Sequence, residues 1–361
     1  MLGAHYYPWY GKPAHSILGA GEWKSGYTDH PILGEYNSRD PAVINQHIAW
    51  AKSAGIDFFV MEWTGPHTWE DTTLKEYYLP ASKAVEIKFC ILYDSYFALN
   101  KLGTLFSYNF NDRYTRAKTK GRKFLDDFEY LADTYFSDPR YLKIGDRPLA
   151  MIYDVHGFRN ASSYLEQLKV AMTKRGFSLF LVADAVFWTS PMSIKEALPI
   201  LWREPLIKII RGVYQAICHS FPSTLERGIS LSRYFDAVFG YNMYMRYRTS
   251  NFLKDVDREY QKFWDYASRH SLHFIPTIMP GYNDRNLRGL TCPILQRKEG
   301  EFYKEFWKIN KKYIDPTLNI LLITTFNEWH EGTEIEPSQE YGFTYLELTK
   351  LLSNELKGEK E

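Results

Sequence analysis

The chain has 361 residues, of which 44 are Lys or Arg and 43 are Asp or Glu. This near-balance of charge excludes a strong global field that would draw the protein to nucleic acid or to an anionic membrane surface. The three cysteines, Cys90, Cys218 and Cys292, are scattered without a metal-binding or redox spacing, which argues against a disulfide framework.

The start of the chain and its apolar runs bear on location. No run of 18 apolar residues is present, so no membrane-spanning helix is expected. The chain opens on "GAHYYPWY", which reads as a strand rather than as a basic segment followed by an apolar one. We therefore expect a cytoplasmic protein, or a secreted one if a signal was removed from the chain.

Eight short apolar runs alternate with amphipathic helical patterns. The runs are continuously apolar rather than alternating, as in parallel strands that are covered on both faces. The expected strands are 3–7, 55–63, 87–94, 147–154, 178–184, 235–242, 273–280 and 318–326.

The helical patterns carry recognisable end signals. The pattern over 40–55 has Asp40 as N-cap, Pro41 at the first helical position and Gly55 at its end. Further patterns cover 121–136, 161–176 and 301–314. Length alone would allow two domains, but eight strands alternating with helices predict one α/β domain over 1–361, a (β/α)8 barrel with extended loops after the strands, rather than a doubly wound sheet.

Two connections are long. The first covers 95–121, after the third strand, and the second covers about 185–234, after the fifth. Long connections after barrel strands build walls around active sites. The second could instead form a dimer face or a helix resting on a membrane, and the sequence does not indicate an oligomeric state.

Aromatic residues stand beside carboxylates or amides where the expected strands end, which is where barrel enzymes hold their functional groups. Aromatic residues make up 17% of the chain, with 28 Tyr and 10 Trp. Aromatic faces stack on sugar rings, and carboxylates and amides bind sugar hydroxyls, so the pattern predicts a carbohydrate site. For a single position, the abundance of Tyr is an equally good explanation. The candidates are Tyr7, Trp9, Glu62, Trp63, Tyr93, Asp154, Tyr241, Tyr282, Asn327, Trp329 and His330.

Two glutamates stand three residues apart in "TTFNEWHEGTEIEP", residues 324–337, directly after the eighth strand. If the chain turns there, Glu328 and Glu331 could share one pocket, because residues three apart on a helical turn have Cβ atoms roughly 5 to 6 Å apart. Carboxyl groups about 5 to 5.5 Å apart are typical of retaining glycoside hydrolysis. Crowded carboxylates also separate in pKa, so that one can act as acid while the other stays ionised. The pair is therefore the candidate catalytic pair, although most Glu-x-x-Glu pairs lie on solvated helix faces.

Other chemistry has little support in the sequence. None of the ten His falls in a zinc-binding spacing, and the glycines at 19–21 do not follow a strand as a dinucleotide loop would. We expect neither a metal nor a cofactor. His47, inside a helical pattern, reads as structural.

The motif "NEWHEGTEIEP" resembles the signature of the family 99 glycoside hydrolases, the endo-α-mannosidases and endo-α-mannanases, and of their WbsX-like relatives. The resemblance extends to "YYPWYG", to residues 30–63, to residues 124–154 and to "PGYNDRNLRG", in the same order along the chain. It implies a (β/α)8 barrel without a cofactor that cleaves an internal α-mannosidic bond with retention.

The resemblance also implies roles for individual residues. Glu328 matches the residue that takes the proton of the sugar's 2-hydroxyl, so that O2 attacks C1 and forms a 1,2-anhydro sugar. Glu331 matches the acid that protonates the leaving oxygen and then activates water. Tyr241 corresponds to a tyrosine beside the reacting sugar, and Tyr7 and Arg288 fall where contacts to that sugar are expected. At position 334 the chain carries Glu, as in the WbsX-like relatives, whereas the hydrolases of the family more often carry Gln there.

The implied route limits the substrate to a 1,2-trans glycoside, since O2 must displace the leaving group from the opposite face of the ring. An α-mannoside meets this condition and an α-glucoside does not. Two alternatives remain open: a WbsX-like enzyme of polysaccharide assembly that transfers the sugar to an acceptor, and a carbohydrate-binding barrel without catalysis. The exact sugar, its linkage, and endo or exo action are not fixed by the residues.

Overall fold

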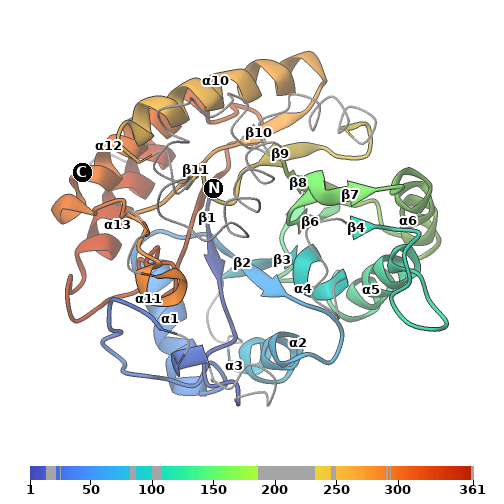
Figure 1. Cartoon of the computed structure of the whole chain (residues 1–361), viewed down its shortest axis with the longest axis horizontal. Helices are drawn as coiled ribbons and strands as arrows, with labels where there is room; N and C mark the ends of the chain where they lie inside the picture. Colours follow the sequence, from blue (N-terminus) through green and yellow to red (C-terminus); the bar gives the residue numbers. More distant parts are fainter. Residues whose placement is uncertain are drawn as a thin grey trace.

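A computed structural model describes residues 1–13, 22–24, 26–81, 87–99, 108–185, 232–244, 249–289, 292 and 294–358. Nine parallel strands of this described part form the central sheet, in the order β10-β9-β8-β6-β3-β2-β1-β12-β11. Helices surround the strands (Figure 1). The strands are β1 Leu2–Tyr6, β2 Phe58–Trp63, β3 Lys88–Tyr93, β6 Arg147–Ile152, β8 Phe180–Asp184, β9 Ala237–Phe239, β10 His273–Ile275, β11 Thr277–Ile278 and β12 Leu321–Ile323.

All eight expected strands are present, and the expected seventh strand is divided in two. Its first part, β10, pairs with β9, and its second part, β11, pairs with β12. Pro276 lies between them and has no N–H to donate to a neighbouring strand. The carbonyl of Pro276 still accepts from the backbone N–H of Leu322 at 3.1 Å. The two short strands together bring the sheet back to β12, so the predicted barrel is confirmed.

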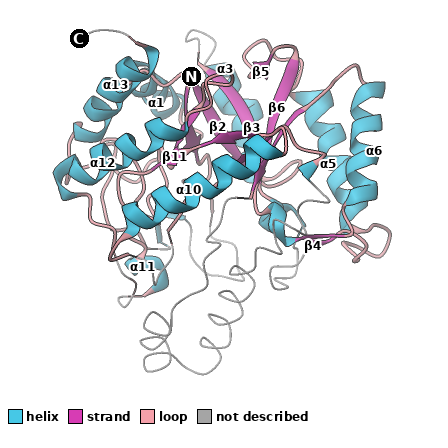
Figure 2. Cartoon of the chain, turned by 90° about the horizontal axis from the view of Figure 1, so that it is seen from above, coloured by secondary structure: helices cyan, strands magenta, loops and turns pink. Residues whose placement is uncertain are grey.

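The helices lie outside the strands, with α10, α12 and α13 on one side of the barrel and α5 and α6 on the opposite side (Figure 2). Short 3-10 helices at Glu22–Lys24, Val155–Gly157, Lys298–Gly300 and Lys311–Tyr313 and a π-helix at Thr73–Tyr78 complete the helical segments of the described part. The α-helices of that part are α1 Pro41–Ser53, α2 Trp69–Thr72, α3 Leu79–Ala81, α4 Ser95–Leu99, α5 Lys120–Thr134, α6 Ser162–Lys174, α10 Phe252–Arg269, α11 Arg285–Arg288, α12 Glu301–Asn310 and α13 Thr344–Lys357.

The expected helix ends are confirmed at α1. Asp40 accepts from the backbone N–H of Ala42 at 2.8 Å, and Pro41 is the first helical residue. Gly55 follows the C-cap with a φ of +74°. The patterns over 121–136, 161–176 and 301–314 correspond to α5, α6 and α12.

Close packing at the start of β1 depends on a residue without a side chain. A Cβ on Gly3 would lie 2.3 Å from the ring of Phe58 and 2.9 Å from the side chain of Leu322, on the two strands that flank β1. His47 on α1 is buried behind the same sheet, between the Tyr6 hydroxyl and Glu336, each 3.0 Å away. Its predicted structural role is confirmed.

The first long connection holds α4 and then β4, Tyr108–Asn109, which pairs with β7, Phe158–Arg159. A further short strand, β5 at Lys143–Ile144, runs antiparallel to β6. The second long connection lies almost wholly outside the described residues, which resume at 232 after 185.

Candidate active site

The chain turns directly after β12, as the candidate pair requires. The Thr325 hydroxyl accepts from the backbone N–H of Glu328 at 2.7 Å, and the Glu328 carbonyl accepts from the N–H of Thr333 at 3.4 Å. The carbonyl of Glu331 accepts from the N–H of Asn283 at 2.7 Å, which ties the turn to the loop after β11. The turn places both glutamates at the carboxyl end of the barrel.

A cavity of about 1000 Å³ opens at this end of the strands. Side chains that follow several strands line it, together with residues of the first long connection and of α11. The lining residues are Tyr7, Trp9, Lys12, Glu22, Lys24, Glu62, Thr64, Thr68, Glu70, Leu92, Asp94, Tyr96, Phe97, Tyr153, Asp154, Tyr241, Leu287, Arg288, Glu328, His330 and Glu331.

Glu328 is buried against a histidine. One carboxylate oxygen lies 3.1 Å from both the backbone N and the Nδ1 of His330, and His330 Nε2 lies 2.8 Å from the carbonyl of Glu22. Burial acts to lower the pKa of His330, but the hydrogen bond and charge of Glu328 outweigh it and raise this pKa to about 9. Both ring nitrogens thus face acceptors, as an imidazolium requires. The second oxygen of Glu328 is buried and has no hydrogen-bond partner among the described residues.

Glu331 lies in a different environment. Its Oε1 accepts from the Tyr282 hydroxyl at 3.1 Å and from both terminal nitrogens of Arg288 at 3.2 Å, and its Oε2 lies 3.4 Å from the amide nitrogen of Asn242. Burial raises the pKa of Glu331, Arg288 opposes this, and the charge of Glu328 adds to it. The outcome is a pKa above the ordinary value, which favours the protonated form that a general acid needs.

Two tyrosines of the cavity wall are hydrogen-bonded to each other. The Tyr7 hydroxyl donates to that of Tyr241 at 2.6 Å. The side chain of Asn327 holds the Tyr7 backbone at both its N–H, 2.7 Å away, and its carbonyl, 3.0 Å away. Burial and then the charge of Glu331 raise the pKa of Tyr241, so its hydroxyl stays neutral and can donate or accept.

The opposite wall is rich in carboxyl groups. Burial, followed by the charge of Asp94, raises the pKa of Glu62 well above its usual value, and the two carboxyls share a hydrogen bond. One oxygen of Glu62 is buried without a partner among the described residues. Asp154 accepts from the Tyr108 hydroxyl at 2.7 Å. This wall therefore offers both acceptors and a carboxyl whose neutral form is favoured.

Nine of the candidate residues line the cavity together. They are Tyr7, Trp9, Glu62, Asp154, Tyr241, Arg288, Glu328, His330 and Glu331. Tyr282 is buried behind two lining residues, because its hydroxyl donates to Glu331 and accepts from Arg288.

Four other candidates are enclosed in the protein, and their expected place in the cavity wall is wrong. Trp63 donates to Asp71 at 2.8 Å and Tyr93 to Asp127 at 3.0 Å, both away from the cavity. Successive strand residues point to opposite faces, so the inward position of Glu62 turns Trp63 outward. Tyr93 is turned outward in the same way, between two lining residues, Leu92 and Asp94.

The turn after β12 also divides its residues between the cavity and the protein interior. Glu328 and His330 line the cavity, whereas Asn327 and Trp329 are fully buried beside them. Asn327 holds Tyr7, and the Trp329 indole donates to Glu336 at 3.1 Å. Both residues support the site from behind.

Several residues of the wall were not among the candidates. Lys12 pairs with the buried Glu70 at 2.8 Å, and Thr64 donates to the same carboxylate at 2.7 Å. No local pattern marks Lys12 or Glu70, which are distant in sequence. Tyr96 and Phe97, on α4, belong to the long connection that was expected to build a wall, and their position there was the available signal.

Glu334, the departure from the hydrolase pattern, is not in the cavity. It is buried in an ion pair with Arg297, whose guanidinium also lies 3.6 Å from Asp29. An amide at position 334 would leave Arg297 with less compensating charge, which accounts for a glutamate there.

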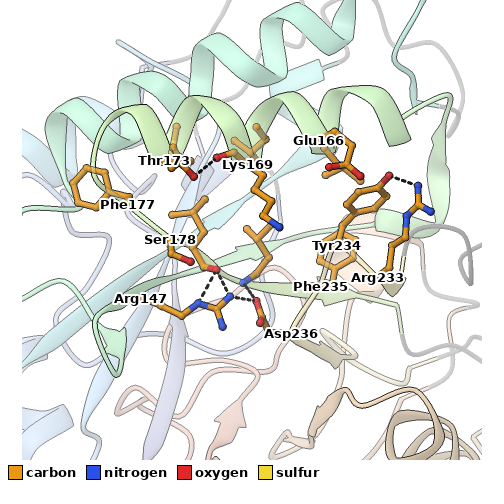
Figure 3. Close-up of a pocket in the computed structure, with 15 residues that line it drawn as sticks. Arg147, Glu166, Lys169, Thr173, Phe177, Ser178, Arg233, Tyr234, Phe235 and Asp236 are labelled. Atoms are coloured by element: carbon orange, nitrogen blue, oxygen red, sulfur yellow. Dashed lines mark hydrogen bonds and ion pairs between the residues drawn. The ribbon is translucent and has the colours of Figure 1, made fainter.

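A second, smaller cavity of about 310 Å³ lies at the other end of the strands, beneath α6. Figure 3 shows the guanidinium of Arg147 directed at Asp236, 2.7 Å away. Its Nε also donates to the carbonyl of Leu179 at 3.1 Å. These polar groups satisfy one another and lie far along the strands from the glutamate pair, so this cavity reads as structural.

The described residues contain no group of three or more His, Cys, Asp or Glu side chains arranged to hold a metal ion. Within the same residues, no helix is long and apolar enough to cross a membrane.

Comparison with known proteins gives relatives along the whole chain. A mouse glycoprotein endo-alpha-1,2-mannosidase-like protein is 25% identical over 418 residues, covering 100% of this chain and 77% of the relative. The rat glycoprotein endo-alpha-1,2-mannosidase is 22% identical over 380 residues, covering 95% of this chain and 70% of the relative.

A solved structure supports the fold. The family 99 endo-alpha-mannosidase from Bacteroides thetaiotaomicron, in complex with bis-tris-propane, superposes with a TM-score of 0.70 at 20% identity, covering 99% of this chain and 97% of that one. This likeness and the mammalian relatives confirm the resemblance that the sequence motifs indicated. The family model described as glycosyltransferase WbsX matches residues 28–349. The chain belongs to this WbsX family.

Proposed function

We propose that the protein is a retaining glycoside hydrolase that cleaves a 1,2-trans glycosidic bond, most specifically an endo-acting α-mannosidase. The observation that carries the proposal is the placement of Glu328 and Glu331 in one cavity with different partners, His330 beside Glu328 and Arg288 beside Glu331. The names of the mammalian relatives agree with this activity. One domain over 1–361 would hold the whole site, and no cofactor enters the reaction.

Glu328 is the proposed base. One of its oxygens, which has no partner among the described residues, is available to the 2-hydroxyl of the sugar, while His330 holds the other oxygen. His330 is a charged donor to that oxygen, and a charge-assisted hydrogen bond of this kind fixes the position of the carboxylate.

Glu331 is the proposed acid and base in turn. In the first step Glu328 takes the O2 proton, O2 bonds to C1, the bond from C1 to the leaving oxygen breaks, and Glu331 gives that oxygen its proton. In the second step Glu331 takes a proton from water, the water oxygen bonds to C1, the C1–O2 bond opens, and Glu328 returns the proton to O2. Two inversions at C1 give retention.

The remaining lining residues form the proposed sugar contacts. Trp9 and the Tyr7–Tyr241 pair offer aromatic surface beside the glutamates, and Glu62 and Asp154 offer carboxyl oxygens on the opposite wall. Arg288 lies beside Glu331. Asn327 binds the backbone of Tyr7 and keeps this tyrosine in place.

The test is turnover on a panel of α-mannose-containing oligosaccharides, followed by mass spectrometry. The wild-type protein should release a shorter oligosaccharide from the members that contain the correct internal linkage, and Glu331→Gln should not. An inactive wild type across the panel would contradict α-mannosidase activity.

A second candidate function has one observation in its favour, the description of the family as a glycosyltransferase. In that case a sugar hydroxyl rather than water would open the 1,2-anhydro ring, with the same two glutamates. Adding candidate acceptor sugars to the panel distinguishes the two, because transfer gives a longer product and hydrolysis a shorter one. Binding to the panel without either product would indicate a carbohydrate-binding barrel.

A further inference from the structure

Arg288 lies at the centre of a group of contacts on one side of the proposed acid. Its Nη1 donates to the Tyr282 hydroxyl at 2.7 Å, to Asp284 at 2.9 Å and to Glu331 at 3.2 Å, and its Nη2 donates to the same oxygen of Glu331 at 3.2 Å. One guanidinium thus connects α11 and the loop before it with the turn after β12.

The partners of Arg288 are themselves held in place. Tyr282 stacks on Tyr244, with ring centroids 3.6 Å apart and planes 10° apart, and also donates to Glu331. Asp284 is 2% exposed and keeps Arg288 from turning freely into solvent, although half of the arginine side chain is exposed. The guanidinium therefore has a defined position at the cavity wall.

We propose that Arg288 is a positioning residue, which holds the Glu331 carboxyl at the cavity wall and stabilises the ionised form needed to activate water. The reactive role of Glu331 rests on the proposed function, whereas the coupling between the two side chains does not. A protonated acid is needed first and a carboxylate second, so a cation that opposes burial keeps both forms accessible.

The groups that face Glu331 shift its pKa in opposite directions. Burial raises its pKa, as do the charges of Glu328 and Asp284, whereas Arg288 and the hydrogen bond from Tyr282 lower it. Tyr241 and Tyr153 also face this carboxyl, and burial keeps both phenols neutral. Of the effects that favour the ionised carboxylate, that of Arg288 is the largest.

A purely structural role for Arg288 would have the same contacts, so the test needs a readout of charge. The ionisation of Glu331 can be followed by carbon NMR on protein labelled at the Glu carboxyl carbons, with the signal assigned by its absence in Glu331→Gln. No substrate is needed. Arg285→Met is the matched control, because Arg285 is on the same helix and donates to the carbonyl of Cys292 at 2.6 Å.

Replacing Arg288 by Met should raise the titration midpoint of Glu331 by about 1 to 3 units, the usual effect of losing an opposite charge at this distance. Arg288→Gln, which keeps donors for Tyr282 and Asp284, should give a shift in the same direction and serves if the Met variant does not fold. Arg285→Met should leave the midpoint unchanged. A midpoint that stays within a few tenths of a unit in both Arg288 variants would overturn the inference.

The pH dependence of turnover separates this inference from the proposed function. Where turnover is found, the basic limb of kcat/KM should move to higher pH in Arg288→Met, because that limb reports loss of the Glu331 proton. If the protein turns over substrate but neither the basic limb nor the NMR midpoint moves in Arg288→Met, the positioning role of Arg288 is contradicted and the proposed hydrolase activity is supported. If the midpoint shifts but the protein turns over no substrate, the coupling between Arg288 and Glu331 is supported and the proposed hydrolase activity is contradicted.

Discussion

Single residues set the difference between the two glutamates. His330 holds one oxygen of Glu328 through a charged hydrogen bond, and the other oxygen has no partner in the part of the chain that the structure describes. Arg288 and Tyr282 hold Glu331 through its Oε1. The same residue type thus stands in two environments, one suited to a base and one suited to a group that gives and then takes a proton.

The two roles should separate when the leaving group changes. Glu328→Gln and Glu331→Gln should each lower kcat/KM on natural oligosaccharides by about 10²- to 10⁴-fold, the usual contribution of a general acid or base. With an aryl mannoside whose phenol leaves without protonation, Glu331→Gln should recover in the first step and Glu328→Gln should not. Glu35→Gln, an exposed partner of Tyr27, is the control. Equal losses on both substrates would contradict the assignment.

The pair of His330 and Glu328 should also make folding stability depend on pH. The pKa of His330 is about 9 in the folded protein and 6.5 unperturbed. The stability that the charged His330 contributes to the folded state is therefore complete below pH 6.5 and is lost as the pH rises through 9. This shift corresponds to roughly 3 kcal/mol. Urea unfolding of wild type and His330→Gln between pH 6 and 10 measures this contribution. If the difference in free energy of unfolding between the two proteins does not shrink over this range, the ion pair is contradicted.

At the scale of elements, the turn after β12 positions the site. Gly332 lies in this turn with a φ of +59°, and a Cβ there would lie 3.0 to 3.1 Å from the backbone N, carbonyl O and side chain of Asn283. The same Asn283 donates its N–H to Glu331. A substitution at 332 would therefore push on the backbone contact that holds the proposed acid.

Gly332→Ala should lower both stability and turnover. The left-handed backbone alone costs a non-glycine residue about 1 to 2 kcal/mol, and displacement of Asn283 adds to this. Gly34→Ala provides the control, because Gly34 has a φ of +71° with nothing within 4 Å of the added Cβ. The control should lose stability without losing kcat, and equal kcat for the two variants would contradict a positioning role for the turn.

The elements show which part of the site could be predicted from the sequence. The apolar runs predict where the strands end, and the cavity lies at those ends. They therefore predict the place of Glu62, Asp154, Tyr241 and the glutamate pair in the cavity. The continuously apolar runs conceal which residues point inward, so Trp63 and Tyr93 were placed in the cavity although they point outward. Leu92 and Asp94, on either side of Tyr93, occupy the wall instead.

At the scale of the whole molecule, the two ends of the barrel have different roles. The carboxyl ends of the strands hold the cavity with the glutamates, and the amino ends hold polar groups that satisfy one another around Arg147. Asp236, which pairs with Arg147, also accepts from the N–H of Leu181 at 2.9 Å. These contacts join the starts of β6, β8 and β9.

Arg147→Met should lower stability without changing turnover. The side chain is 38% exposed, so the loss should be modest, about 1 to 2 kcal/mol, and should come mainly from the hydrogen bonds to Leu179 and Asp236. Arg233→Met, at an exposed arginine beside Tyr234, should leave the free energy of unfolding unchanged within the error of the measurement. A fall in kcat for Arg147→Met would mean that this end of the barrel also controls the site.

The barrel itself could be predicted because each strand is an independent local pattern. The break at Pro276 could have been found from the proline, since proline lacks the N–H that a central strand donates. The contact between Lys12 and Glu70 could not, because it joins segments that only the closed fold brings together. The predicted insertion over 185–234 lies almost entirely outside the described residues.

The most direct measurement of the central claim is the anomeric configuration of the first product, followed by proton NMR during cleavage of an α-mannoside on the panel. In the wild type, the α-anomer of the new reducing sugar should appear first and the β-anomer only later, by mutarotation, and Glu331→Gln should release neither. Initial release of the β-anomer would mean a single displacement by water and would contradict the two-step reaction proposed for Glu328 and Glu331.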